Sequence, residues 1–442
     1  MYLIIIDKYD CNNGFKCQTG VNILKKPKTL SYTSSEYLCR EITRSSVWLR
    51  IIILPTESKS NIQHSKRLEC NKIYLSKKYY LYDPKTIKKF NLRIHKTYVD
   101  MVNMRGCIDL LDWLKSSRLL LQYTDNAIDY ASIYGHVNVL EWWFKSNLQL
   151  KYTENALDNA SIDGQMEVLT WWFNSNLPLK YTDDALDLAS SMGHVDVLEW
   201  WLNSNLPLKY TDDAIDNASK IGHVKVLTWW VNSKLPLKYT ENALDNASRN
   251  GHLEVLTWWL NSKLPLKYSA STLDCASYDG HVEVLTWWLK SNLSLKYSSD
   301  AMDWASFNGH VEVLKWWRKS NLPLKYSEEA LDDASKKGHI HVLEWWKKSK
   351  LKLKYTAKSL DNASSKGQVE VLKWWLKSNL PLKYSYSALI DASMNGHISV
   401  LNWWKGSRLP LKYSYDVMDR VKSYRDDTNI INWWLKSGLN VI

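Results

Sequence analysis

The chain repeats itself every 29 residues over most of its length. A glycine marks each repeat, and these glycines are Gly106, Gly135, Gly164, Gly193, Gly222, Gly251, Gly280, Gly309, Gly338, Gly367 and Gly396. Tryptophan pairs keep the same spacing, from Trp142-Trp143 to Trp403-Trp404. A fixed period of this length is typical of a solenoid, in which each repeat packs only on its neighbours. Solenoids present long surfaces to partners, so the period favours binding over catalysis.

The net charge of +12 is unevenly distributed. Residues 1–98 carry 19 Lys/Arg against 7 Asp/Glu, and the remainder carries 39 of each. We therefore expect the repeat array to be close to neutral and not to bind polyanions through net charge alone. The six cysteines show no metal-ligand spacing and no disulfide framework, which favours reduced thiols inside a cell. No apolar stretch approaches the ~18 residues of a membrane span.

One repeat, residues 181–209, predicts two short helices and a connector. Thr182 precedes two acidic residues and an apolar run, a pattern typical of a helix N-terminus. Gly193 ends the first helix, because glycine tolerates the left-handed conformation that closes helices. A second apolar-periodic run follows at 195–202, and Leu206-Pro207-Leu208 predicts an extended connector. Each repeat is thus predicted to be a helical hairpin joined to the next by a short connector.

A tyrosine column places the repeat boundaries. It consists of Tyr123, Tyr152, Tyr181, Tyr210, Tyr239, Tyr268, Tyr297, Tyr326, Tyr355, Tyr384 and Tyr413. A degenerate copy precedes it at 94–122, and the last copy, 413–442, has lost the glycine. Degenerate ends are expected of capping units, whose outer faces meet water. We predict twelve repeats over 94–442 and a mainly α solenoid.

Residues 1–93 show no repeat and predict a small basic α+β domain. Strands are predicted at Tyr2–Ile6, 47–54, 72–75 and 79–82. Asp83-Pro84 predicts a helix start, since proline suits the first helical position.

The run ALDLASSMGHVDVLEWWL at 185–202 resembles the ankyrin repeat. Leu186, Ala189, Gly193, His194, Val197 and Leu198 match its pattern, and Trp200-Trp201-Leu202 replace its three leucines. The Trp-Trp variant is similar to the ankyrin-like families of giant DNA viruses of amoebae, which implies a location in the host cytoplasm. The unit is about four residues shorter than the usual ~33, so the resemblance implies a helical-hairpin solenoid with shortened fingers.

Two constant columns are open to a structural or a functional interpretation. The Trp pairs suit a core better than a stacking platform for bases, and each indole N–H then needs an acceptor. The Asp column runs from Asp100 to Asp361 and is interrupted by Ile390. One acid per repeat leaves neighbours about 8–10 Å apart, too far to share a metal ion. We predict that each carboxylate accepts a hydrogen bond from a backbone or indole N–H.

Two further columns are predicted to be structural. Gln165 and Gln368 replace members of the His column, which favours a hydrogen-bonding role over metal binding. The Lys column, Lys151 to Lys412, either recruits an acidic partner or covers the adjacent Tyr rings while its ammonium groups stay solvated. The second alternative is favoured because acids balance bases in the array.

Variable positions of the first helix are the candidate binding surface. They are offset by three and four residues and so share one face. In ankyrin proteins this helix lines the concave side, and exposed aromatic residues there would anchor a partner. The predicted partner-binding residues are Tyr134, Tyr278, Trp304, Phe307, Lys336 and Lys337.

These patterns favour a non-enzymatic scaffold, expected to be a monomer, that binds a protein through its concave helical face. No Walker loop, nucleophile motif or Cys/His ligand set appears outside the repeat columns, so no cofactor or metal is expected. The alternative is a nucleic-acid-binding protein acting through the basic N-terminal domain.

Overall fold

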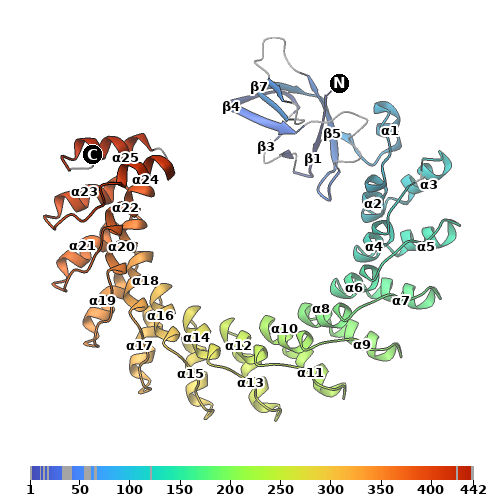
Figure 1. Ribbon diagram of the computed structural model, residues 1–442. Coiled ribbons are helices and arrows are strands. Elements are labelled where there is room, and N and C mark those ends of the chain that lie inside the picture. Colours follow the sequence, from blue (N-terminus) through green and yellow to red (C-terminus); the bar gives the residue numbers. More distant parts are fainter. Residues whose placement is uncertain are drawn as a thin grey trace. The chain divides into compact units, whose positions relative to one another are not determined.

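The computed structural model describes residues 2–9, 11–12, 15–16, 19–31, 42–53, 61–63, 67–119, 122–424 and 427–439. The chain divides into two compact units, Met1–Ala214 and Ile215–Ile442. The first unit holds a β-sheet and the first helix pairs, and the second unit holds helix pairs throughout (Figure 1). The proposed division at residue 93 therefore stays a prediction.

The N-terminal region contains a six-stranded antiparallel sheet, in the order β1-β5-β7-β4, with β6 beside β7 and β8 beside β5. The strands β2 and β3 pair separately as a two-stranded antiparallel sheet. The strands are β1 Tyr2–Ile6, β2 Cys11–Asn12, β3 Phe15–Lys16, β4 Gly20–Ser31, β5 Trp48–Ile53, β6 Asn61–Gln63, β7 Arg67–Leu75 and β8 Tyr79–Tyr80. The four predicted strands are confirmed. The long strand β4 escaped prediction; its register shifts between Ile23 and Lys28. Helix α1, Pro84–Phe90, starts where predicted, with Asp83 accepting from the Lys85 N–H.

Twelve helix pairs follow α1, as predicted. In the first unit they are α2 Lys96–Met104, α3 Ile108–Ser116, α4 Asn126–Ile133, α5 Val137–Lys145, α6 Asn155–Ile162, α7 Met166–Asn174, α8 Asp184–Met192 and α9 Val195–Asn203. Helix α10, Asp213–Ile221, spans the division between the units. In the second unit they are α11 Val224–Asn232, α12 Asn242–Arg249, α13 Leu253–Asn261, α14 Ser271–Tyr278, α15 Val282–Lys290, α16 Asp300–Phe307, α17 Val311–Lys319, α18 Glu329–Lys337, α19 Ile340–Lys348, α20 Lys358–Ser365, α21 Val369–Lys377, α22 Ser387–Met394, α23 Ile398–Gly406, α24 Val417–Tyr424 and α25 Thr428–Lys436.

Local chemistry sets the helix ends in each repeat. In repeat 239–267 the Thr240 hydroxyl accepts from the Asn242 N–H and so caps α12. Gly251, at φ 78°, makes the turn between α12 and α13, which confirms the predicted role of the glycine column. Lys263 then adopts a left-handed conformation at φ 62° and directs the chain into the connector. Within 122–424 the connectors contain no β-strand, in agreement with the predicted short fingers.

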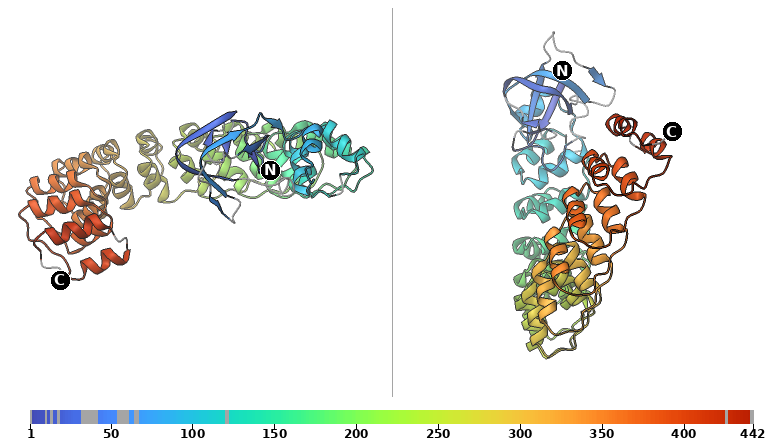
Figure 2. Two further views of the ribbon diagram at one scale, coloured as in Figure 1. Left: turned by 90° about the horizontal axis from the view of Figure 1, so that it is seen from above. Right: turned by 90° about the vertical axis from the view of Figure 1, so that its left-hand side faces the viewer.

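Side-chain size explains the curvature within each unit. The first helices lie along the inner side of the row and the second helices along the outer side (Figure 1). First helices such as α12 and α14 approach each other more closely than second helices such as α13 and α15. The first helices bury alanine and serine, whereas the second helices bury tryptophan. Because interhelical distance follows the side chains between helices, this difference bends the row. Figure 2 shows the same stacking from two further sides.

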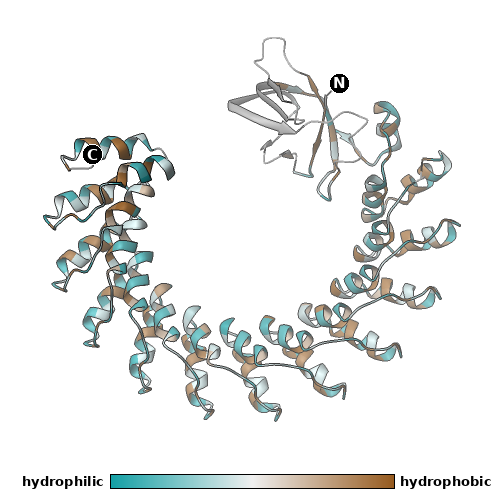
Figure 3. Ribbon diagram, viewed as in Figure 1, coloured by the Kyte–Doolittle hydropathy of each residue, from teal (hydrophilic) through white to brown (hydrophobic). Residues whose placement is uncertain are grey.

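The two tryptophans of a pair play different parts. The second of each pair is no more than 1% exposed and packs on the Tyr of its own repeat, as Trp288 does on Tyr268 with ring centroids 4.9 Å apart. Its indole N–H donates to a buried polar side chain on the first helix of the preceding repeat, which is Asn103 for Trp143 and a serine in later repeats, such as Ser248 for Trp288 at 2.9 Å. The first of each pair is half-buried, apart from the buried Trp229. The core interpretation is thus confirmed for the second ring and holds in part for the first. Figure 3 shows hydrophobic and hydrophilic residues alternating along the helices.

The Asp column joins each repeat to the next. Asp303 accepts from the Ser327 N–H at 2.9 Å and from the Ser327 hydroxyl at 2.7 Å. That hydroxyl in turn accepts from the Glu329 N–H at the start of α18. The predicted hydrogen bond from a backbone N–H is confirmed. The indole N–H groups whose acceptors the structure describes donate to residues outside the Asp column, as Trp288 does to Ser248. The carboxylate therefore orients the hydroxyl that caps the next helix.

The His column fills the space above the glycine column. A Cβ added to Gly309 would lie 3.1 Å from the His339 ring, and one added to Gly338 would lie 2.7 Å from Gln368 Oε1. His and Gln thus occupy equivalent places, which explains why glutamine can replace histidine.

The Lys column contacts the tyrosine at the start of its own repeat. Lys325 Nζ lies 4.5 Å from the Tyr297 ring centroid and donates to the Tyr297 carbonyl at 2.9 Å. The prediction that each lysine covers the adjacent Tyr ring is confirmed, and Lys325 stays exposed. Its ammonium group in addition ties consecutive connectors together.

Candidate protein-binding face

The variable first-helix positions of the second unit carry three aromatic residues in two neighbouring repeats. Tyr278 ends α14, whereas Trp304 and Phe307 lie on α16. The Tyr278 and Trp304 rings meet edge to face, with centroids 5.7 Å apart. Repeats such as 355–383 have Asn362 and Ser365 at the corresponding positions, so the stack itself does not require aromatic residues there.

Cations flank these rings on both sides. The Arg249 guanidinium lies 5.7 Å from the Tyr278 ring centroid, and Lys337 Nζ lies 4.4 Å from the Phe307 ring centroid. Lys336 is half-buried and Lys337 is exposed. We call Tyr278, Trp304, Phe307, Lys336 and Lys337 the aromatic patch.

The aromatic side chains are less exposed than the sequence suggested. Tyr278, Trp304 and Phe307 are each half-buried, because each ring rests on a neighbour from the next repeat or on a cation. The prediction of fully exposed aromatic anchors is thus corrected. A partner would meet ring edges that are already held in place.

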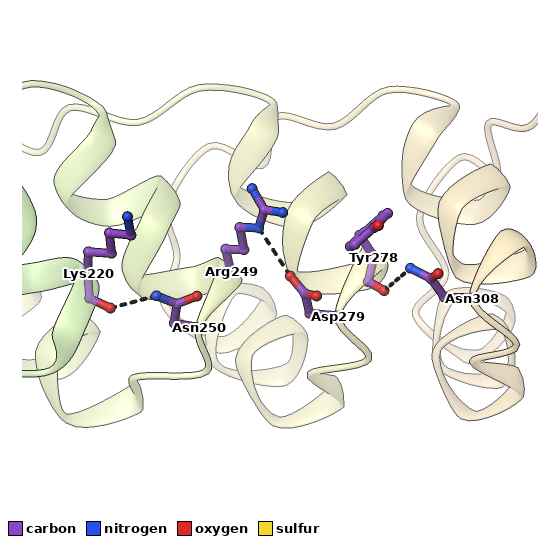
Figure 4. Close-up of polar contacts among 6 residues, drawn as sticks. All are labelled: Lys220, Arg249, Asn250, Tyr278, Asp279 and Asn308. Atoms are coloured by element: carbon purple, nitrogen blue, oxygen red, sulfur yellow. Dashed lines mark hydrogen bonds and ion pairs between the residues drawn. The ribbon is translucent and has the colours of Figure 1, made fainter. Parts of the chain in front are cut away.

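Polar contacts between repeats fix the backbone beside the patch (Figure 4). The Asn308 side-chain amide donates to the Tyr278 carbonyl at 2.8 Å, and Asn250 does the same to the Lys220 carbonyl at 2.6 Å. Arg249 pairs with Asp279 at 3.3 Å. Lys220, Arg249, Asn250 and Asp279 line a shallow groove together with Ile221, Asn246, His252 and His281. The sequence alone did not identify this groove, because its contacts join residues 30 positions apart.

Tyr134 lies in a different place from the rest of the predicted site. It is in the first unit and 39% exposed. Arg44, from the N-terminal region, lies 5.1 Å from the ring centroid of the neighbouring Tyr130. Hydrogen bonding to Tyr130 and the proximity of Tyr134 raise the pKa of Arg44. Tyr134 therefore contacts the N-terminal region of its own chain, and the structure gives no sign that it joins the aromatic patch.

The repeat array is neutral in total, but its two parts carry net charges of opposite sign. Residues 99–214 carry 7 Lys/Arg against 17 Asp/Glu, whereas residues 215–442 carry 32 against 22. The array as a whole is neutral, as expected, but residues 215–442 taken alone carry a net charge of +10 (32 − 22).

The described residues offer little support for metal chemistry or for a membrane span. In that part of the chain, no group of three or more His, Cys, Asp or Glu side chains could hold a metal ion. No helix described by the structure is long and apolar enough to cross a membrane. Burial raises the pKa of the Cys275 thiol, which disfavours the reactive thiolate.

Comparison with known proteins finds a family match within the repeat array. Residues 273–316 match the family model described as ankyrin repeats (many copies). No curated protein matches the chain. Among solved structures, the ankyrin repeat domain of human ASB11 aligns with 40% of this chain and 90% of its own length, at 16% identity and a TM-score of 0.34. The segment that matches the family model contains most of α14, all of α15 and α16 and most of α17, and so covers the aromatic residues of the patch.

Proposed function

We propose that this ankyrin-repeat protein is a non-enzymatic scaffold that binds a protein partner through the first-helix face of its second unit. The observation that carries the proposal is the aromatic patch, in which half-buried rings stand beside cations on positions that the stack leaves free. Aromatic residues and arginine supply most binding energy at protein interfaces. Rings already held by neighbours lose little conformational entropy when a partner covers them.

The resemblance of the Trp-Trp repeats to families of giant DNA viruses of amoebae guides the choice of partner. We infer that the partner is a protein of the host cell and that the chain acts in its cytoplasm. Acting as a scaffold requires no cofactor, and we propose that the chain works as a monomer.

The rival function, nucleic-acid binding by the basic N-terminal region, finds less support. Several of its cations are engaged within the chain. Arg50 is 1% exposed and donates to Thr19 and to the Ser76 carbonyl, and Lys89 lies 4.4 Å from the Tyr79 ring centroid. Such groups are not free to contact phosphates.

A paired substitution tests the proposed function. Trp304→Asn with Phe307→Ser introduces the residues that repeat 355–383 has at these positions, so the fold should persist. We expect the variant to keep its helical circular dichroism and to lose at least one protein that the unmodified chain captures from host-cell extract.

The matched control is Leu188→Asn with Met192→Asn, which changes the same helix face in the first unit. It should capture the same proteins as the unmodified chain. Identical captured sets from all three folded proteins would contradict the assignment of the patch.

A further inference from the structure

Six cations stand at the ends of four consecutive second helices in the second unit. They occupy the last two residues of α17, α19, α21 and α23, and they are Arg318, Lys319, Lys347, Lys348, Lys377 and Lys405. All six are exposed. The helices α17, α19, α21 and α23 neighbour one another in order (Figure 1). Because the six cations lie in the last turns of these helices, they form a row, which we call the basic stripe.

The fold does not require this charge. The corresponding residues are Val231-Asn232 in α11 and Leu260-Asn261 in α13, where the last turn holds no basic residue. A cation near a helix C-terminus gains about 0.3–1 kcal/mol from the helix dipole. A lysine also lies in the last turn of α3, α5 and α15, whereas α7, α9, α11 and α13 have no basic residue in the last turn. The dipole gain is the same for every second helix, so it does not explain why α17 and α19 each end in two cations.

Most of the stripe has no charge partner. Glu312 and Glu370, on α17 and α21, pair with Lys315 and Lys373, which lie outside the stripe. Glu344 pairs with Lys348 at 3.2 Å. Over the residues that the structure places, no ion pair engages the other five cations of the stripe. A row of like charges of this kind repels itself until an anion neutralises it.

The side-chain chemistry of the stripe selects among anions. Five of its six members are lysine, a compact point charge on a flexible stem. Lysine is depleted in protein–protein interfaces, where aromatic residues and arginine are enriched. Contacts to a nucleic-acid backbone, in contrast, are made largely by lysine and arginine and carry no sequence information.

We propose that the basic stripe binds the phosphate backbone of a nucleic acid without sequence preference. Neighbouring helices pack about 8–10 Å apart, and the phosphates of one nucleic-acid strand are spaced ~3.4 Å apart along the helix axis. The C-terminal ends of successive second helices would therefore meet about every third phosphate of a strand. The stripe is separate from the aromatic patch, because it lies on second helices rather than first helices. The inference therefore stands or falls independently of the proposed protein partner.

Anisotropy of a fluorescein-labelled DNA duplex of arbitrary sequence, titrated with the full chain over a range of salt concentrations, tests this inference. Lys319→Asn with Lys348→Asn removes two charges and introduces the residue present at Asn232 and Asn261. Each phosphate contact contributes about −0.9 to the slope of log K against log salt. We expect the slope to become shallower by about 2 in this variant.

The control is Lys220→Ser with Lys366→Asn, which removes two exposed charges from first-helix positions of the same unit and should leave the slope unchanged. Equal slopes in all three proteins would overturn the inference, since binding would then involve another surface such as the basic N-terminal region. Displacement of the duplex by poly-glutamate at equal charge concentration would also overturn the inference, because it would identify an acidic polypeptide as the ligand of the basic stripe. Failure of the unmodified chain to bind the duplex at low salt would also overturn it.

Discussion

At the scale of single residues, folding changes the ionisation of the buried Asp-column carboxylates most. Burial raises the pKa of Asp303 from 3.8 to about 6, against the opposing hydrogen bonds from Ser327. Burial likewise raises the pKa of six other members of the column, Asp100, Asp129, Asp158, Asp187, Asp274 and Asp361. The repeats that contain these seven carboxylates thus accept a cost in charge burial to cap the first helix of the next repeat.

The pH dependence of stability should reveal this cost. A carboxyl whose pKa is higher in the folded state holds more protons when folded, between its unfolded and folded pKa values. Its effect on stability therefore falls as pH rises through that window and is level above it. We expect the urea midpoint to rise between about pH 7 and about pH 5, and Asp303→Asn to remove part of that rise.

The exposed Glu283→Gln serves as the control for this measurement and should keep the full rise. An Asp303→Asn protein with an unchanged pH profile would show that the carboxylate titrates normally in the folded chain.

At the scale of the helix pair, the turn glycines carry two constraints at once. Gly309 has φ 83°, and a Cβ there would lie 3.1 Å from the His339 ring of the next repeat. A left-handed conformation alone costs a non-glycine residue about 1–2 kcal/mol. We expect Gly309→Ala to lower the urea midpoint by an amount that corresponds to about this cost or more, because the His339 ring must also move.

Gly406 provides the matched control, since it lies at the end of α23 with nothing within 4 Å of its added Cβ. Gly406→Ala should leave the midpoint unchanged or raise it, because alanine favours a helix by about 0.5–1 kcal/mol. Equal losses in both variants would mean that neither the backbone conformation nor the histidine contact matters.

The contacts between repeats mark the limit of what the sequence could predict at this scale. Periodicity located every helix pair, because each pair is defined by residues a few positions apart. The serine that accepts a hydrogen bond from a buried indole lies 40 residues from the tryptophan in the chain, as Ser248 and Trp288 show. Such a partner becomes visible only once neighbouring repeats are placed side by side. The serine column from Ser132 to Ser393, which follows an alanine in ten consecutive repeats, was nevertheless a signal that could have been used.

At the scale of the whole molecule, total charge proved a poor guide to the surface. Counting the array as one body gave neutrality, whereas the counts for 99–214 and 215–442 differ in sign. The predicted binding residues divide in a similar way. Tyr278, Trp304, Phe307, Lys336 and Lys337 lie together in the second unit, but Tyr134 lies beside Arg44 in the first. The repeat period and the composition could not show which predicted residues lie together, because that depends on which side chains are in contact in the folded chain.

Site-specific photo-cross-linking tests the central claim, that a partner protein binds the first-helix face of the second unit. Phe307 is replaced by p-benzoylphenylalanine in the full chain, and a second protein carries the same group at Leu260, which is 37% exposed on the second helix α13. After irradiation in host-cell extract, the account predicts a discrete protein adduct from position 307 and none of that mass from position 260. An adduct from position 260 alone, or adducts of the same mass from both positions, would contradict it.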